Sequence, residues 1–230
     1  MRLSIDHRRG LVVTIPAGPR GGSAGIAAAA AFAAEREPWI RRHLAAVDAA
    51  RAAEVARGPL GDGTVVPYRG EPHLLRVVAG GPRRRSSVTR VGGDDGDEIH
   101  VALVDRDAER LAAVLEAWMR SRARDTIGRA AARHARALGV QPSAVTIRDQ
   151  RTRWGSASRT GRVSFSWRLV LAPPEALETV VVHELAHLRV FGHPPAFWAL
   201  VATRAPEHRR WRRWLRDHAA ELHGVLAETG

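Results

Sequence analysis

The sequence predicts an α+β protein with two domains. The first domain, residues 1–104, is expected to be β-meander-rich with one helix, because four short strand-like segments follow an alanine-rich segment and are separated by glycine-rich turns. The second domain, residues 105–230, is expected to be mostly helical with a small sheet, because its apolar residues recur mainly at helical spacing. A chain of 230 residues is long enough to bury such cores.

The first domain is expected to begin with a strand at residues 11–15, an apolar run that ends at a proline. Ser23 is a candidate N-cap for a helix that reaches Arg57, since its alanine run has high helix propensity. The acidic turn at residues 92–96 lacks the ligand spacing of a calcium loop and is expected to be a solvated hairpin. Four strands are expected at residues 64–68, 73–78, 87–91 and 98–104.

The second domain is expected to begin with a long helix from Asp105 or Asp107 to Leu138, with His134 on its apolar side as a core or boundary histidine. A later helix has proline at its first position and Gly192 just after its end, which are typical helix boundaries. Short strands are expected at residues 145–147 and 163–165, and helices at residues 174–191, 194–203 and 206–222.

The most specific chemical signal lies in the helix predicted at residues 174–191, where the chain reads His183-Glu184-Leu185-Ala186-His187. Residues i and i+4 lie on one face of an α-helix, so both imidazoles can reach one metal ion. A catalytic zinc keeps three protein ligands and a water. Glu184 is not needed as a ligand and is placed to act as general base for that water. The pattern predicts zinc-assisted hydrolysis, most naturally of a peptide bond.

His193 is the favoured third ligand. It follows His187 by six residues, the interval found in the longer H-E-x-x-H-x-x-G-x-x-H pattern, and it needs only a short turn to reach the metal. Val190 stands where that pattern has glycine, so the chain is not a metzincin by motif. The alternative is a ligand from a later helix, for which the candidates are Glu207, His208, Asp217, His218 and Glu221.

Further segments accompany this motif along the chain. They are Thr-Arg-Trp-Gly-Ser-Ala-Ser at residues 152–158, Trp-Arg-Leu at 167–169, Ala-Pro-Pro at 172–174, three valines at 180–182, and Phe-Trp at 197–198. Together with the motif they resemble the YgjP-like family of zinc metallopeptidases, which is related to the SprT and WLM groups. The similarity is strongest over residues 150–216 and extends more weakly to nearly the whole chain.

The resemblance implies a zincin-like metallopeptidase fold for residues 105–230. It implies one zinc ion per chain, with Glu184 as the catalytic carboxylate and His183, His187 and His193 as the ligands. The family usually has cysteine where this chain has Ala157, so no metal-binding or redox role exists at that position.

Zinc-dependent hydrolysis of a peptide bond needs more than the ligands. Zinc lowers the pKa of its bound water toward 7, and Glu184 takes a proton from this water and later passes it to the leaving amine. His208 and Arg153 are candidates for stabilising the oxyanion. Residues 162–167 are expected to hold an extended substrate by strand addition. Candidates for orienting the zinc ligands are Glu175, Glu178 and Glu207.

Arginine supplies the whole positive charge of the chain. There are 36 Lys and Arg residues, none of them lysine, against 24 Asp and Glu, which gives a net charge of +12. Clusters at residues 83–85 and 209–213 would attract phosphates, so a DNA-associated SprT-like protease, or a nucleic-acid-binding protein with a structural zinc, is the alternative function. The favoured interpretation places the arginines on solvated faces and buries Trp211, Trp214 and Leu215 at helical spacing.

The chain is expected to be a cytoplasmic protein that acts on peptides or proteins. It has no cysteine, and no apolar stretch is long enough to span a membrane. The apolar run after Arg8-Arg9 is broken at Pro16, which is too early for a signal peptide. A metal-free interaction module that has lost catalysis is disfavoured by the intact quartet of three histidines and Glu184. The oligomeric state and the identity of the substrate stay open.

Overall fold

The computed structural model describes residues 1–6, 10–14, 23–38, 40–42, 44–45, 48, 52, 58–79, 85–93, 96–104, 108–150 and 152–226. The chain divides into two compact units, Met1–Ala56 and Arg57–Gly230. The first unit contains an antiparallel pair, β1 (Arg2–Asp6) and β2 (Gly10–Thr14), and the helix α1 (Ser23–Ala34). A turn at residues 35–36 ends this helix at Ala34, and the described residues 37–38, 40–42, 44–45, 48 and 52 are again helical, so the predicted helix is interrupted. Its predicted end at Arg57 lies outside the described residues.

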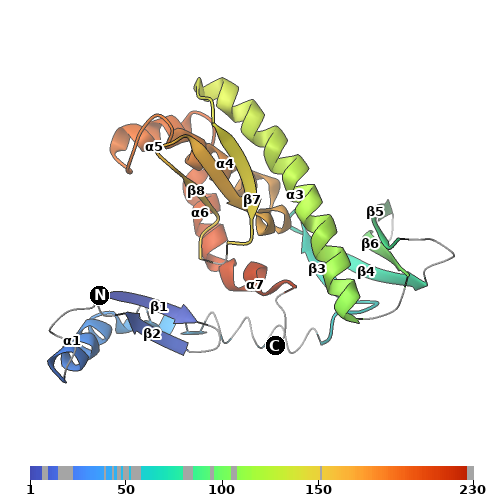
Figure 1. The fold of residues 1–230 in the computed structure, drawn as a ribbon, viewed down its shortest axis with the longest axis horizontal. Coiled ribbons are helices and arrows are strands. Elements are labelled where there is room, and N and C mark those ends of the chain that lie inside the picture. The colour runs from blue at the N-terminus through green and yellow to red at the C-terminus, as the bar shows by residue number, and fades with distance from the viewer. Residues whose placement is uncertain are drawn as a thin grey trace. The chain divides into compact units, whose positions relative to one another are not determined.

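The second unit combines two sheets with helices, which confirms the α+β class (Figure 1). The strands of the larger sheet are β3 (Val65–Tyr68), β4 (Glu71–Ala79), β5 (Ser87–Gly93) and β6 (Gly96–Leu103). The smaller sheet contains β7 (Ala144–Arg148), β8 (Gly155–Ala157) and β9 (Arg162–Ser166). The helices are α3 (Ala108–Leu138), the 3₁₀ helix η1 (Trp167–Leu171), α4 (Pro174–Ala186), α5 (Pro195–Ala202), α6 (His208–Asp217) and α7 (Ala219–Gly224).

The four strands of the larger sheet are connected differently from the predicted meander. Their order is β3-β4-β6-β5, with β3–β4 and β5–β6 as antiparallel hairpins and β4 parallel to β6. A parallel pair needs a connection longer than a hairpin turn, and residues 80–95, which include β5, provide it. The two central strands bury Leu75, Ile99 and Val101 completely. The predicted domain boundary at residue 104 falls inside this unit, between β6 and α3, and stays a prediction.

Helix α3 runs alongside both sheets and packs on β5, β6, η1, β7 and α4 (Figure 1). Its buried residues recur every fourth position, which places them on one face. His134 is buried as predicted, and its Nε2 meets the Glu178 carboxylate of α4. The apolar face of α3 is formed by Leu111, Leu115, Met119, Ala123 and Ile127.

The turn between β3 and β4 holds the chain just before α4. The amide of Arg69 donates to the Val170 carbonyl, and the amide of Gly70 donates to the Leu171 carbonyl, both at 2.9 Å. Gly70 has a φ of +84°, and a Cβ added there would lie 2.9 Å from the Cα of Pro173. Only glycine fits this contact without displacing the residue that precedes α4.

None of the described helices has the length and apolar character needed to cross a membrane. The cytoplasmic location stays a prediction.

Replacing Gly70 with alanine tests the contact between this turn and Pro173. The left-handed backbone costs about 1–2 kcal/mol for a residue with a Cβ, and forcing that Cβ against Pro173 adds about 1–3 kcal/mol. Gly63→Ala is the matched control, because Gly63 has a φ of +79° but no atom within 4 Å of an added Cβ. Urea denaturation should show the larger loss for Gly70→Ala, whereas equal losses would show that the contact with Pro173 contributes nothing.

Candidate metal centre

The histidines at positions 183 and 187 are carried by α4 and by the turn that follows it. The helix ends at Ala186, five residues earlier than predicted. His187 caps it, because its backbone amide donates a hydrogen bond to the His183 carbonyl. The backbone amides of Leu188 and Arg189 donate hydrogen bonds to carbonyls three residues earlier, which makes a tighter turn than that of an α-helix. Gly192 then adopts a φ of +74°, which reverses the chain. This tight turn and the reversal at Gly192 end the helix early and bring His193 close to His183 and His187.

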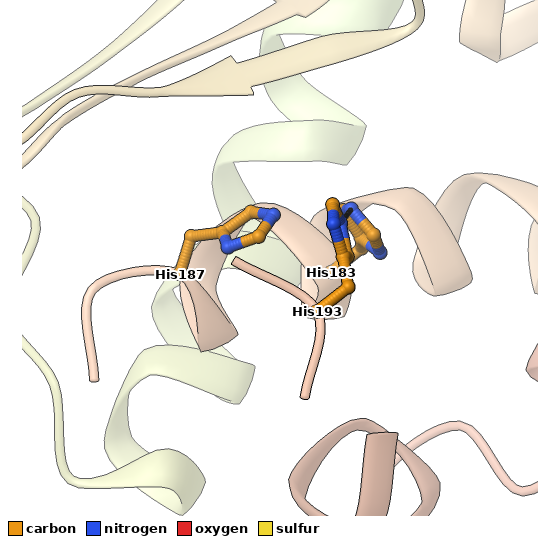
Figure 2. A group of neighbouring side chains, drawn as sticks. All are labelled: His183, His187 and His193. Atoms are coloured by element: carbon orange, nitrogen blue, oxygen red, sulfur yellow. Dashed lines mark hydrogen bonds between the residues drawn. The ribbon is translucent and has the colours of Figure 1, made fainter. Parts of the chain in front are cut away.

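The three predicted histidines lie together beside α4 (Figure 2). Their candidate ligand atoms are all within 4.8 Å of one another, and the Nε2 atoms of His183 and His193 are 3.3 Å apart. Two imidazole nitrogens on a tetrahedral zinc, each about 2.0–2.1 Å from the ion, are separated by about 3.3–3.4 Å. Within the described ranges, no other group of histidine or acidic side chains has spacing suited to a metal. The alternative third ligands, which lie on α6 and α7 or cap these helices, do not join the cluster.

The orientation of the rings is set by one hydrogen bond and by two aromatic side chains of α5. His187 donates from Nδ1 to the Val190 carbonyl at 3.3 Å, which leaves Nε2 available for a metal. The same ring stacks on Phe197, with the centroids 4.4 Å apart. His193 stacks on Trp198 at 5.3 Å. The prediction that Phe197 and Trp198 pack behind the metal site is in agreement with these contacts.

The electrostatic environment keeps two of these imidazoles neutral. Burial, reinforced by His187, His193 and Arg212, lowers the pKa of His183 to about 3. Burial also lowers the pKa of His187, although its bond to the Val190 carbonyl opposes the shift. A metal ion binds the neutral form of imidazole, so these rings need not lose a proton at neutral pH before they bind.

Glu184 is buried between α4 and β8, with 7% of its surface exposed. Burial raises the pKa of its carboxyl to about 7, and the positive charge of Arg153 opposes this shift. A Cβ added at Gly155 would lie 2.7 Å from Cγ and 2.9 Å from Oε1 of Glu184. Sequence reasoning did not single out Gly155 for this role, although a glycine within a strand often marks the close approach of another group.

The prediction that residues 162–167 hold a substrate by strand addition is wrong. These residues form β9 and the start of η1, and β9 is the central strand, parallel to β7 on one side and antiparallel to β8 on the other. Both of its edges are therefore already paired. The edge strand next to α4 is β8, which contains Gly155 and Ala157.

The two candidates for stabilising an oxyanion have different surroundings. His208 is buried and stacks on Trp198 at 5.3 Å, so it belongs to the same aromatic layer as His193. Arg153 is exposed and acts on the charge of Glu184. Arg153 is therefore linked to Glu184 through its charge, and His208 is linked to His193 through the ring of Trp198.

Two of the carboxylates considered for orienting the ligands are bound to arginines instead. Glu178 meets Arg133 and His134 of α3, and this pairing lowers the pKa of Glu178 against the opposing effect of its burial. Glu207 accepts a hydrogen bond from Arg210 at 3.2 Å. Their contacts join helices or neighbouring turns and give no support to a role at the three histidines.

Comparison with known proteins points to a peptidase family. The family model described as YgjP-like, metallopeptidase domain, matches residues 1–218. A solved structure, the metallopeptidase zymogen of Pyrococcus abyssi abylysin, is 23% identical with a TM-score of 0.34, and the match covers 39% of this chain and 92% of that one. A search of curated proteins gave no match.

Gly155→Ala tests whether the space beside β8 keeps the Glu184 carboxyl buried. The added methyl group should push the flexible side chain outward, and better hydration should lower its pKa from about 7 toward the ordinary 4.5. The pKa is measured in the metal-free protein by ¹³C NMR of labelled glutamate. Gly128→Ala, on an open face of α3, is the control. An unchanged pKa in Gly155→Ala would contradict the assigned contact.

Proposed function

The chain belongs to the YgjP-like metallopeptidase family, and from this premise we propose that it is a zinc-dependent peptidase. His183, His187 and His193 hold one zinc ion, and Glu184 is the catalytic carboxylate. The observation that carries the proposal is the convergence of the three imidazoles, together with the burial of the Glu184 carboxyl next to His183 in the sequence of α4.

The donor set suits zinc better than magnesium or calcium. Three imidazole nitrogens are ligands that zinc accepts readily, whereas magnesium and calcium prefer oxygen. The separation of 3.3 Å between the Nε2 atoms of His183 and His193 fits tetrahedral coordination. When bound, zinc lowers the pKa of a water molecule toward 7 and polarises the carbonyl of the substrate.

Glu184 moves the protons of the reaction. Its carboxylate accepts a proton from the attacking water and then delivers this proton to the nitrogen of the departing amine. Burial between α4 and β8 limits the positions of the carboxylate, so it need not be reordered at each turnover. Arg153, whose positive charge acts on the same carboxyl, favours its ionised form.

The edge strand β8 is where we place the substrate backbone. It packs on α4, and its Gly155 touches Glu184, so a peptide paired along β8 would bring a scissile bond beside the carboxylate. Addition of an extended peptide to an exposed sheet edge is a common recognition mode, in which main-chain hydrogen bonds supply affinity.

The competing proposal is a DNA-associated SprT-like protease or a nucleic-acid-binding protein with a structural zinc. Its support is α6, where Arg209, Arg210, Arg213 and Arg216 are exposed. Against base stacking, Leu215 of the same helix is buried, and both of its tryptophans pack partly against the core. A contact with nucleic acid through α6 would therefore rest on phosphate charge.

Glu184→Gln separates catalysis from metal binding. The amide keeps the shape of the side chain but does not accept the proton, so cleavage of dye-quenched casein should fall by about 10²–10⁴-fold. Elemental analysis should find the zinc content unchanged. Glu71→Gln, at an exposed position on β4 to which no role at the site is assigned, is the control and should keep full activity. A Glu184→Gln variant that retains both zinc and full activity would end the proposal.

A further inference from the structure

A cavity of about 250 Å³ lies where the loop after α3, the turn between β8 and β9, and the segment after His187 meet. Sites that enclose a whole small molecule usually measure about 300–1,000 Å³, so this cavity suits a single side chain. Its walls include Ser158 and Arg159 from the turn, and Leu188, Arg189 and Phe191 from the segment after His187.

Two guanidinium groups give this cavity a positive character. Arg189 donates from Nη1 to the Leu138 carbonyl at 3.1 Å, which ties the side chain to the end of α3. The Cζ of Arg159 is 5.8 Å from the centre of the Phe191 ring, which is 56% exposed. Among the described residues that line the cavity, none is Asp or Glu. An anion entering the cavity would therefore meet two cations and no competing carboxylate.

The cavity lies within reach of a peptide bound as proposed above. Its wall begins at Ser158, the residue directly after β8, and Ser158 follows Gly155 by three residues. At about 3.3 Å per residue, this distance along an extended strand is roughly 10 Å. Phe191, which also lines the cavity, stands between His187 and His193 in the sequence. A peptide that pairs with β8 and is cleaved beside Glu184 would thus bring its third or fourth residue from the scissile bond to the cavity.

We propose that this cavity is a specificity site for a carboxylate of the substrate, formed chiefly by Arg159 and Arg189. The carboxylate is that of an Asp or Glu side chain three or four residues from the scissile bond, or the C-terminal carboxylate of a short peptide. Arginine presents a planar fork of donors that matches a carboxylate, and Phe191 covers the apolar stem of the side chain. This inference rests on the proposed peptidase function, because it uses the same placement of the substrate on β8.

Peptide binding tests the proposal directly. The full-length Glu184→Gln protein, reconstituted with zinc, is titrated with fluorescein-labelled, C-terminally amidated dodecapeptides of alanine and serine that carry either glutamate or glutamine at every third position. Fluorescence anisotropy gives Kd. The glutamate peptide should bind about tenfold more tightly, as a charge-assisted hydrogen bond requires. Arg159→Gln in the same protein should reduce this preference to less than about twofold. A glutamine peptide with a free C-terminus distinguishes the terminal from the side-chain carboxylate.

Arg148→Gln is the control for an effect of the protein's overall positive charge. Arg148 is an exposed arginine on β7, the strand at the other edge of the small sheet. This variant should keep the full preference for glutamate. Equal loss of the preference in Arg148→Gln and Arg159→Gln would mean that net charge alone attracts acidic peptides and would overturn the proposal. Equal binding of all the peptides to the Glu184→Gln protein would also overturn it.

The outcomes separate this inference from the proposed function. If wild-type protein cleaves casein and Glu184→Gln does not, but the peptides bind without preference, the peptidase stands and the carboxylate site fails. If Glu184→Gln is fully active but Arg159→Gln alone abolishes the preference for glutamate, the cavity binds carboxylates and the assigned catalysis fails.

Discussion

Helix α4 packs against α3, η1, β8, α5 and α6. This packing shields His183 and Glu184 from bulk water. Burial is the dominant influence on the pKa of both His183 and Glu184, in opposite directions: it favours neutral imidazole and it favours the protonated carboxyl. Both neutral forms are tolerated in an apolar setting, whereas three imidazolium ions at these distances would repel one another. The packing that stabilises the fold thus also prepares the histidines for a metal.

Two glycines let the backbone and side chains come close enough for this packing. Gly70 brings the turn of the larger sheet against Pro173 at the start of α4, and Gly155 makes room for the carboxyl of Glu184 beside β8. The first contact fixes where the helix begins, and the second fixes where its carboxyl lies relative to the sheet edge. The long helix α3 connects these parts, because it packs on the larger sheet and pairs through Arg133 and His134 with Glu178 of α4. The start of α4 is therefore fixed by the larger sheet, and the position of the Glu184 carboxyl is fixed by β8 of the smaller sheet.

Features that depend on local spacing were predicted from the sequence, and features that depend on distant pairing were not. The i, i+4 histidines and the apolar face of α3 follow from periodicity within one element, and the turn at Gly192 follows from the preference for glycine just after a helix. The parallel pairing of β4 with β6 and the central position of β9 depend on which strands meet in space, and strand patterns do not specify their neighbours. The contact between Gly155 and Glu184 joins residues 29 positions apart through packing alone, so no spacing in the sequence predicted it.

The zinc content of the protein tests the central claim most directly. Tag-free wild-type protein, reconstituted with zinc and desalted, is compared by elemental analysis with the His187→Ala variant, while circular dichroism establishes that the variant is folded. We expect about one zinc per chain in the wild type, because three imidazoles converge on one point, and less than about a tenth of that in the variant. Wild-type protein without zinc after reconstitution, or a variant with an unchanged zinc content, would contradict the assignment of the three histidines as a metal site.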